Sequence, residues 1–185
     1  IAHDAVPALI QRFTDPERNI PPQAVYALGR IGSNAVPALI GALPDRDPRI
    51  RLGAVRSLSA ILPLDAKTLQ GLIAAARDAD PEVRLAAVEA IGQTRPYAPE
   101  SVVALTNALA DVESVVRRKA LEGLQRAGRR AAPAVPALIH ALDDESEPIR
   151  AAAARVLANL GPAASNAVAS LNARLNDPAP GVRSN

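Results

Sequence analysis

Few residues in this chain could perform acid–base, nucleophilic or metal-dependent chemistry. The histidines are His3 and His140, and there is no cysteine. Neither histidine has a second metal ligand at a workable spacing. No serine has an evident base and orienting residue, and no glycine-rich loop is present to cradle a phosphate. We therefore expect no catalytic residues, no metal ligands and no cofactor, and we interpret His140 as a partly exposed position on a helix.

The residues that recur do so as parts of an internal repeat. The hexapeptide Ala-Val-Pro-Ala-Leu-Ile occurs at 5–10, 35–40 and 134–139. With the chain aligned on its proline, the first interval is 30 residues and the next four are 33 residues. This regularity predicts an array of stacked units. A leucine follows two residues after the aligned position in every copy, namely Leu9, Leu39, Leu72, Leu105, Leu138 and Leu171.

Aspartate and arginine form two further columns of the repeat. Strict repetition at one structural position favours a role in holding the array together over a role as an anion-binding stripe. The aspartates are Asp15, Asp45, Asp78, Asp111, Asp144 and Asp177. Six residues after each of them stand Pro21, Arg51, Arg84, Arg117, Arg150 and Arg183.

Each unit is predicted to form two helices, A and B, separated by a turn that contains the aspartate. The segment Asp80-Pro81-Glu82 is typical of a helix start, and Asp47-Pro48 repeats the device. Glycines near the ends of the B helices are predicted to be left-handed caps: Gly32, Gly92, Gly128 and Gly161. A column of alanines on helix B predicts close packing of neighbouring helices: Ala24, Ala54, Ala87, Ala120 and Ala153.

A two-helix unit with Val-Pro-Ala-Leu-Ile in helix A, aspartate in the turn and Val/Ile-Arg-x-x-Ala on helix B resembles the HEAT repeat, in particular the PBS-lyase HEAT-like subclass. The resemblance implies an all-α fold, a right-handed α-α solenoid of about five and a half helical hairpins, with the B helices on its concave face. It also implies a ladder between adjacent repeats, formed by Asp45, Asp78, Asp111 and Asp144 with Arg51, Arg84, Arg117 and Arg150.

We predict a single HEAT-like array over residues 1–185. In the first unit Pro21-Pro22 replaces the arginine, and three residues are missing before the next helix A, so a local change in stacking is expected there. Both ends interrupt a unit, which suggests a segment of a longer array that lacks its native N-terminus. The units are 5–33, 34–65, 66–98, 99–131, 132–164 and a partial one at 165–185.

Specificity is expected from positions on helix B that the repeat does not dictate. These lie one, two, five and nine residues after the arginine column and are predicted to face the concave side. The candidate partner-binding residues are Gln23, Tyr26, Arg30, Arg56, Glu89, Gln93, Arg118, Lys119, Glu122, Arg126, Arg155 and Asn159. Arg118, Lys119, Arg126, Arg129, Arg130 and Arg155 are predicted to form one basic patch in repeats 4 and 5. That patch is either a solvated charged face or a site for an acidic partner.

The leading hypothesis is a non-catalytic scaffold that binds another protein through the helix-B surface. Nucleic-acid binding through the basic patch is a weaker alternative, because the formal charge is only +2 and aromatic residues make up 2% of the chain. An enzyme subunit related to phycobilin lyases is a further alternative, suggested only by the repeat subclass. No apolar run is long enough to span a bilayer, so no membrane insertion is expected and a soluble, cytoplasmic protein is the default.

Overall fold

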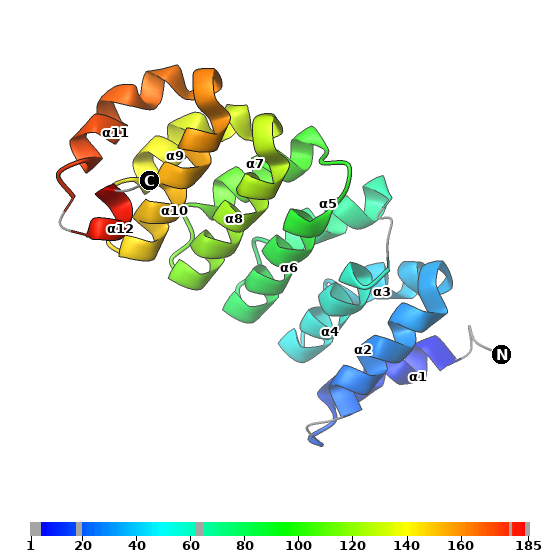
Figure 1. Cartoon of the computed structure of the whole chain (residues 1–185). Coiled ribbons are helices and arrows are strands. Elements are labelled where there is room, and N and C mark those ends of the chain that lie inside the picture. The colour runs from blue at the N-terminus through cyan, green and yellow to red at the C-terminus, as the bar shows by residue number, and fades with distance from the viewer. Residues whose placement is uncertain (1–4, 18–19, 62–64, 178, 184–185) are drawn as a thin grey trace. The chain divides into compact units, whose positions relative to one another are not determined.

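The computed structural model describes residues 5–17, 20–61, 65–177 and 179–183, and the regular structure in these ranges is helical, without a strand (Figure 1). This confirms the predicted all-α class. The chain divides into two compact units, residues 1–90 and residues 91–185. Within the described residues, each of the six ranges assigned to repeats contains two α helices.

The first unit contains the first two hairpins and most of the third. Within this unit α2 lies against α4, so one B helix stacks on the next. The A helices α1, α3 and α5 stack in the same order. The elements are α1 (Val6–Gln11), η2 (Arg12–Thr14), α2 (Ile20–Ile31), η3 (Gly32–Ala35), α3 (Val36–Ala42), α4 (Pro48–Ser59), α5 (Ala66–Ala75) and α6 (Pro81–Gln93), whose last turn belongs to the second unit.

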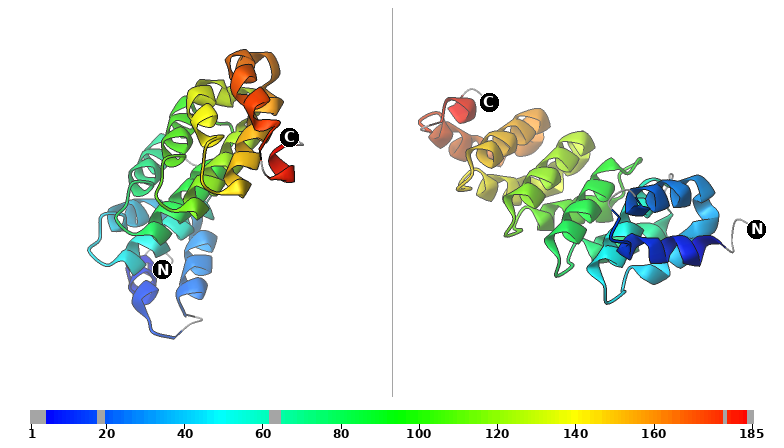
Figure 2. Two further views of the ribbon diagram at one scale, coloured as in Figure 1. Left: turned by 90° about the vertical axis from the view of Figure 1, so that its left-hand side faces the viewer. Right: turned by 90° about the horizontal axis from the view of Figure 1, so that it is seen from below.

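The second unit repeats this arrangement. Here α8 lies against α10, α8 also packs on α7 and α10 on α9, and α10 contacts α12 (Figure 2). Helical turns of 3-10 type lead from one hairpin into the next. The elements are α7 (Pro99–Ala108), α8 (Ser114–Ala127), η4 (Gly128–Ala134), α9 (Val135–Ala141), α10 (Glu147–Leu160), η5 (Gly161–Ala167), α11 (Val168–Arg174) and α12 (Pro180–Arg183).

Local sequence accounts for where these helices begin. The Asp47 side chain accepts a hydrogen bond from the Arg49 N–H at 2.9 Å, and Pro48 occupies the first helical turn of α4. Asp80 accepts hydrogen bonds from the N–H groups of Glu82 and Val83 in the same way at the start of α6. The N-capping devices read from the sequence are therefore confirmed.

The core of each unit is made from the repeated aliphatic columns. Leu39, Leu72, Leu105 and Leu138 have no solvent exposure, whereas Leu9 and Leu171, in the first and last hairpins, are half-buried. The alanine column on the B helices is at most 3% exposed, as close packing of stacked helices requires. Aliphatic burial between hairpins is therefore the main force that holds each unit together.

Three of the four predicted glycine caps have a positive φ, but the ψ values of Gly128 and Gly161, −132° and −129°, lie outside the left-handed helical region. Gly32, Gly128 and Gly161 have φ values of 70°, 57° and 55°. The prediction for Gly92 was wrong, because α6 continues to Gln93 and Gly92 lies inside it. Gly92 is needed instead for packing, since an added Cβ would lie 3.1 Å from the Cα of Gly123 on α8.

Candidate partner-binding surface

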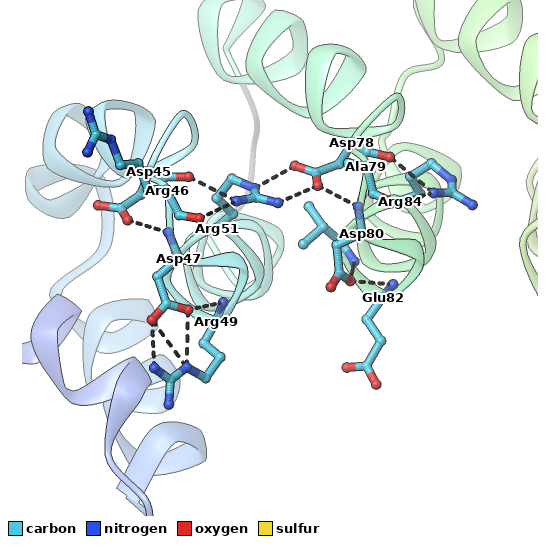
Figure 3. Close-up of polar contacts among 11 residues, drawn as sticks. Asp45, Arg46, Asp47, Arg49, Arg51, Asp78, Ala79, Asp80, Glu82 and Arg84 are labelled. Atoms are coloured by element: carbon cyan, nitrogen blue, oxygen red, sulfur yellow. Dashed lines mark hydrogen bonds and ion pairs between the residues drawn. The ribbon is translucent and has the colours of Figure 1, made fainter.

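The surface of the B helices is supported by arginine side chains that bridge successive turns. In the first unit, the guanidinium of Arg51 donates two hydrogen bonds to the Asp78 carboxylate, from Nε at 2.7 Å and from Nη2 at 2.6 Å (Figure 3). Its Nη1 donates to the carbonyl oxygens of Asp45 at 2.9 Å and Arg46 at 3.2 Å. Arg51 therefore ties its own turn to the turn of the next repeat.

The same geometry recurs twice in the second unit. Arg117 donates to the Asp144 carboxylate from Nε at 2.7 Å and from Nη2 at 2.9 Å, and Nη1 donates to Asp111 O at 2.9 Å. Arg150 donates to Asp177 from Nε at 2.9 Å and from Nη2 at 3.0 Å. We call each arginine and the aspartate of the following repeat a rung. Arg84 likewise donates from Nη1 to the carbonyls of its own turn.

Rungs of this kind need arginine, because only a planar guanidinium can present two parallel donors to a carboxylate and a third to a carbonyl. Arg117 is only 7% exposed, so the rung is shielded from water and screened less than a surface ion pair. Each acceptor aspartate also accepts a hydrogen bond within its own turn, as Asp144 does from the Ser146 N–H at 2.8 Å. In each of these three rungs, the arginine and the aspartate therefore connect one repeat to the next.

The rungs shift the acidity of their carboxyl groups. Burial disfavours the charged form of Asp78, but hydrogen bonds from Arg51 and from the Asp80 N–H outweigh it, so the pKa of Asp78 lies below its ordinary value of 3.8. Hydrogen bonds from Arg150 and from the Ala179 N–H lower the pKa of Asp177 in the same direction. The folded chain therefore stabilises the charged form of both carboxyl groups more than the unfolded chain does.

This shift predicts a loss of stability in acid. Because the folded-state pKa values lie below 3.8, the stabilisation by Asp78 and Asp177 is complete above about pH 4 and is lost as the pH falls through the folded pKa values. We expect the urea midpoint to fall between pH 6 and pH 3. The Arg51→Met and Arg150→Met variants should lose less over this range than wild type. Equal losses would show that the rungs do not cause the acid sensitivity.

The predicted partner-binding residues lie on the B helices and are mostly exposed. Tyr26 is 67% exposed on α2, and Arg118 is exposed on α8 immediately after the buried Arg117. Three candidates are half-buried: Glu89, Lys119 and Glu122. The exposed candidates are Gln23, Tyr26 and Arg30 on α2, Arg56 on α4, Gln93 on α6, Arg118 and Arg126 on α8, and Arg155 and Asn159 on α10.

Part of the predicted basic patch is neutralised within α8. Glu122 accepts hydrogen bonds from Arg118 Nη1 at 3.1 Å and from Lys119 Nζ at 3.1 Å, and Arg126 Nη2 lies 3.6 Å from the same carboxylate. Three cations therefore share one anion, and the positive charge they present is smaller than the sequence suggested. Arg129 and Arg130 in η4 and Arg155 on α10 are exposed.

The first unit contains a pocket that sequence reasoning missed. It has a volume of about 380 Å³ and lies where α2 and α4 stack. A possible sequence signal was the Pro21-Pro22 pair in the column where the following units have arginine. The pocket is lined by Phe13, Asp15, Pro21, Pro22, Val25, Arg49, Leu52, Gly53 and Arg56.

Gly53 and Phe13 fit together at the floor of this pocket. A Cβ added to Gly53 would lie 2.3–2.6 Å from ring atoms of Phe13, which is itself 3% exposed. We expect Gly53→Ala to lower the free energy of unfolding by about 1–3 kcal/mol through overpacking. Gly41→Ala is the control, because no atom lies within 4 Å of its added Cβ. If urea denaturation gives both variants the same free energy of unfolding, then Gly53 does not pack closely against the Phe13 ring.

The two histidines are the remaining candidates for chemistry. His140 is exposed on α9, and His3 lies outside the described residues. Across the described part of the chain, no group of three histidine, cysteine or acidic side chains is placed to bind a metal ion. In the same ranges, no helix combines the length and apolar character needed to cross a membrane.

Comparisons with known proteins agree with this architecture. The family model for HEAT repeats matches residues 6–92, 63–125 and 102–185. A chain from the complex of CpcE and CpcF of phycocyanin lyase from Nostoc sp. PCC7120 is 28% identical, with a TM-score of 0.71, over 83% of this chain and 98% of that chain.

Two further solved structures share the fold alone. The E. coli protein YibA has a TM-score of 0.71 at 22% identity, over 95% of this chain and 66% of that chain. A designed armadillo repeat protein in complex with the peptide (KR)4 has a TM-score of 0.60 at 17% identity, over 97% of this chain and 95% of that chain. A search of curated proteins gives no match. The repeated columns, the stacked hairpins and the family match agree, and the chain belongs to the HEAT repeat proteins.

Proposed function

We propose that this chain is a non-catalytic scaffold that binds another protein through the exposed face of its B helices. The observation that carries the proposal is the contrast between neighbouring positions on one helix. Arg117 is buried in a rung, whereas Arg118, one residue later, is exposed and differs in type from its equivalents in other repeats. The stacking of the repeats therefore does not depend on these side chains. Contact with a partner protein would explain why they vary from one repeat to the next.

The composition of this face favours a protein partner over nucleic acid. Positive and negative side chains are interspersed on α8, where Glu122 neutralises part of the charge of Arg118, Lys119 and Arg126. Tyr26 is the one exposed aromatic side chain in the described residues, so base stacking has little support. The similarity to a chain solved in a two-protein complex, CpcE with CpcF, supports the same choice.

Affinity capture with paired surface variants tests the proposal. The immobilised chain should retain a protein from an extract of its source organism after nuclease treatment. The double variant Arg118→Glu/Arg155→Glu, on α8 and α10, should lose that protein. The double variant Asn107→Glu/His140→Glu, at exposed positions on the A helices α7 and α9, should retain it. Recovery of nucleic acid alone, or equal recovery by both variants, would overturn the proposal.

The second candidate is an enzyme subunit that acts on a phycobilin. The observation that favours it is the 28% identity to a chain of phycocyanin lyase. Incubation of the purified chain with a phycobilin and an apo-phycobiliprotein tests it through the absorbance of the bound chromophore. A change in the bilin spectrum would support this candidate, and an unchanged spectrum would remove it.

A further inference from the structure

The pocket between α2 and α4 arises where the repeat departs from its own pattern. In three described rungs, an arginine near the start of one B helix reaches the aspartate of the next repeat: Arg51, Arg117 and Arg150. The equivalent position in the first repeat is Pro21, which lines the pocket. Proline has no long side chain that could reach the aspartate of the next repeat, so this rung is not formed.

The aspartate of the missing rung, Asp45, does not line the pocket, and its hydrogen bonding differs from that of the rung aspartates. Asp45 occupies the position equivalent to Asp78, Asp144 and Asp177, each of which accepts two hydrogen bonds from an arginine. The Asp45 carboxylate accepts a hydrogen bond from the Asp47 N–H at 2.8 Å. Among the described residues, no arginine side chain reaches that carboxylate.

The walls of the pocket are largely apolar. Phe13 lies against Gly53 at its floor, and Val25 and Leu52 are half-buried at its sides. Pro21 adds a rigid surface from the start of α2. A volume of about 380 Å³ is at the lower end of the range for small-ligand pockets and is enough for one large side chain with its neighbouring backbone.

The three charged side chains at the pocket differ in whether they have an ion-pair partner. Arg49 is paired with Asp47 at 2.7 Å, and Asp15 is paired with Arg12 at 3.2 Å. Arg56 is exposed, and its guanidinium has no acceptor among the described residues. Among the described residues, the pocket therefore presents an apolar cavity beside Arg56, a cation without an acceptor.

We propose that this pocket binds an apolar side chain of the partner protein, with a carboxylate next to it that pairs with Arg56. The proposal rests on the proposed function, because it assigns part of the partner's chemistry. The apolar walls exclude a highly charged ligand, and the cation selects an anionic neighbour. An aromatic or long aliphatic side chain beside an aspartate, a glutamate or a chain terminus has this chemistry.

The test uses two probes that differ only in charge, N-acetyl-L-phenylalanine and its amide. The intact chain labelled with ¹⁵N is titrated with each, and backbone amide shifts are followed. We expect saturable shifts at Phe13, Leu52, Gly53 and Arg56 with both probes, and tighter binding of the acid. An absence of shifts at these residues, or equal binding of acid and amide, would overturn the proposal.

Matched variants separate the apolar contribution from the charge contribution. Arg56→Gln should weaken binding of the acid by about 3–10-fold and leave the amide unchanged. Arg155→Gln, at the equivalent exposed position of another repeat, should change neither. Leu52→Ala should weaken both probes by about threefold, whereas Leu85→Ala, its equivalent in the third repeat, should weaken neither. Folding of each variant is checked by the dispersion of the remaining amide signals.

Other occupants give different outcomes. If inorganic phosphate alone reproduces the shifts of the acid, the pocket is an anion site and the proposal fails. If raising the protein concentration alone moves the same signals, the occupant is a second copy of the chain and the proposal fails. If the probes do not bind but a partner still depends on Arg118 and Arg155, only the pocket proposal is overturned. If the probes bind but no partner protein is captured, the proposed function fails.

Discussion

Leu138→Ala is expected to lower the free energy of unfolding by about 2–5 kcal/mol. Leu138 belongs to the leucine column of the A helices and has no solvent exposure. Its side chain fills the space between α9 and the neighbouring helices, and alanine would leave a cavity there that stacked hairpins close only in part. Urea denaturation followed by circular dichroism measures the change.

Leu175→Ala is the matched control for this prediction, because Leu175 is 60% exposed. It should change stability by less than about 0.5 kcal/mol. Similar losses in the two variants would mean that the leucine column is not the core of the array. In the Leu138→Ala variant, the rate of amide hydrogen exchange should rise first in α9 and α10, since each hairpin contacts mainly its neighbours.

Arg117→Met is expected to cost about 2–4 kcal/mol, the second largest effect. The variant keeps the length and apolar stem of the side chain but removes every hydrogen bond to Asp144, Asp111 and Val112. The Asp144 carboxylate is then held near the protein interior without its cation. Arg117→Lys should recover only part of the loss, because an ammonium cannot donate in parallel to a carboxylate and to the turn carbonyls.

A double-mutant cycle isolates the rung itself. Asp144→Asn retains an oxygen that can accept from the Ser146 N–H, so it removes the charge and leaves the turn capped. The coupling energy between Arg117→Met and Asp144→Asn should be about 1–3 kcal/mol. Arg129→Met, at an exposed position, should show no coupling with Asp144→Asn. A coupling near zero for the Arg117 pair would contradict the role assigned to the rungs.

Most of the frame could be predicted from the sequence because it repeats. The leucine and alanine columns indicate buried seams. The alanines and the four leucines of the inner repeats are buried, whereas Leu9 and Leu171 are half-buried. The exception was Gly92, which the sequence alone could not distinguish from a cap. Its role depends on the approach of Gly123 from another helix, and that approach is a property of the packing.

The surface was less predictable because it also depends on how the helices pack against one another. The interpretation of Arg118 and Arg126 as part of one basic patch left out Glu122, which lies at i,i+4 spacing from both and pairs with them on α8. The pocket near Pro21 had a weaker signal. Its shape depends on Phe13 meeting Gly53 across two repeats, and no rule of local sequence brings those residues together.

The most direct test of the proposed binding face is a map of photo-crosslinking positions. A benzophenone amino acid is placed at Tyr26, Arg118 or Arg155 on the B helices, and at Val103 or His140 on the A helices; all are exposed. We predict that one partner protein crosslinks from the helix-B positions and not from the helix-A positions. Crosslinks that form mainly from Val103 and His140, or equally from both sets, would contradict the assignment of the B helices as the binding face.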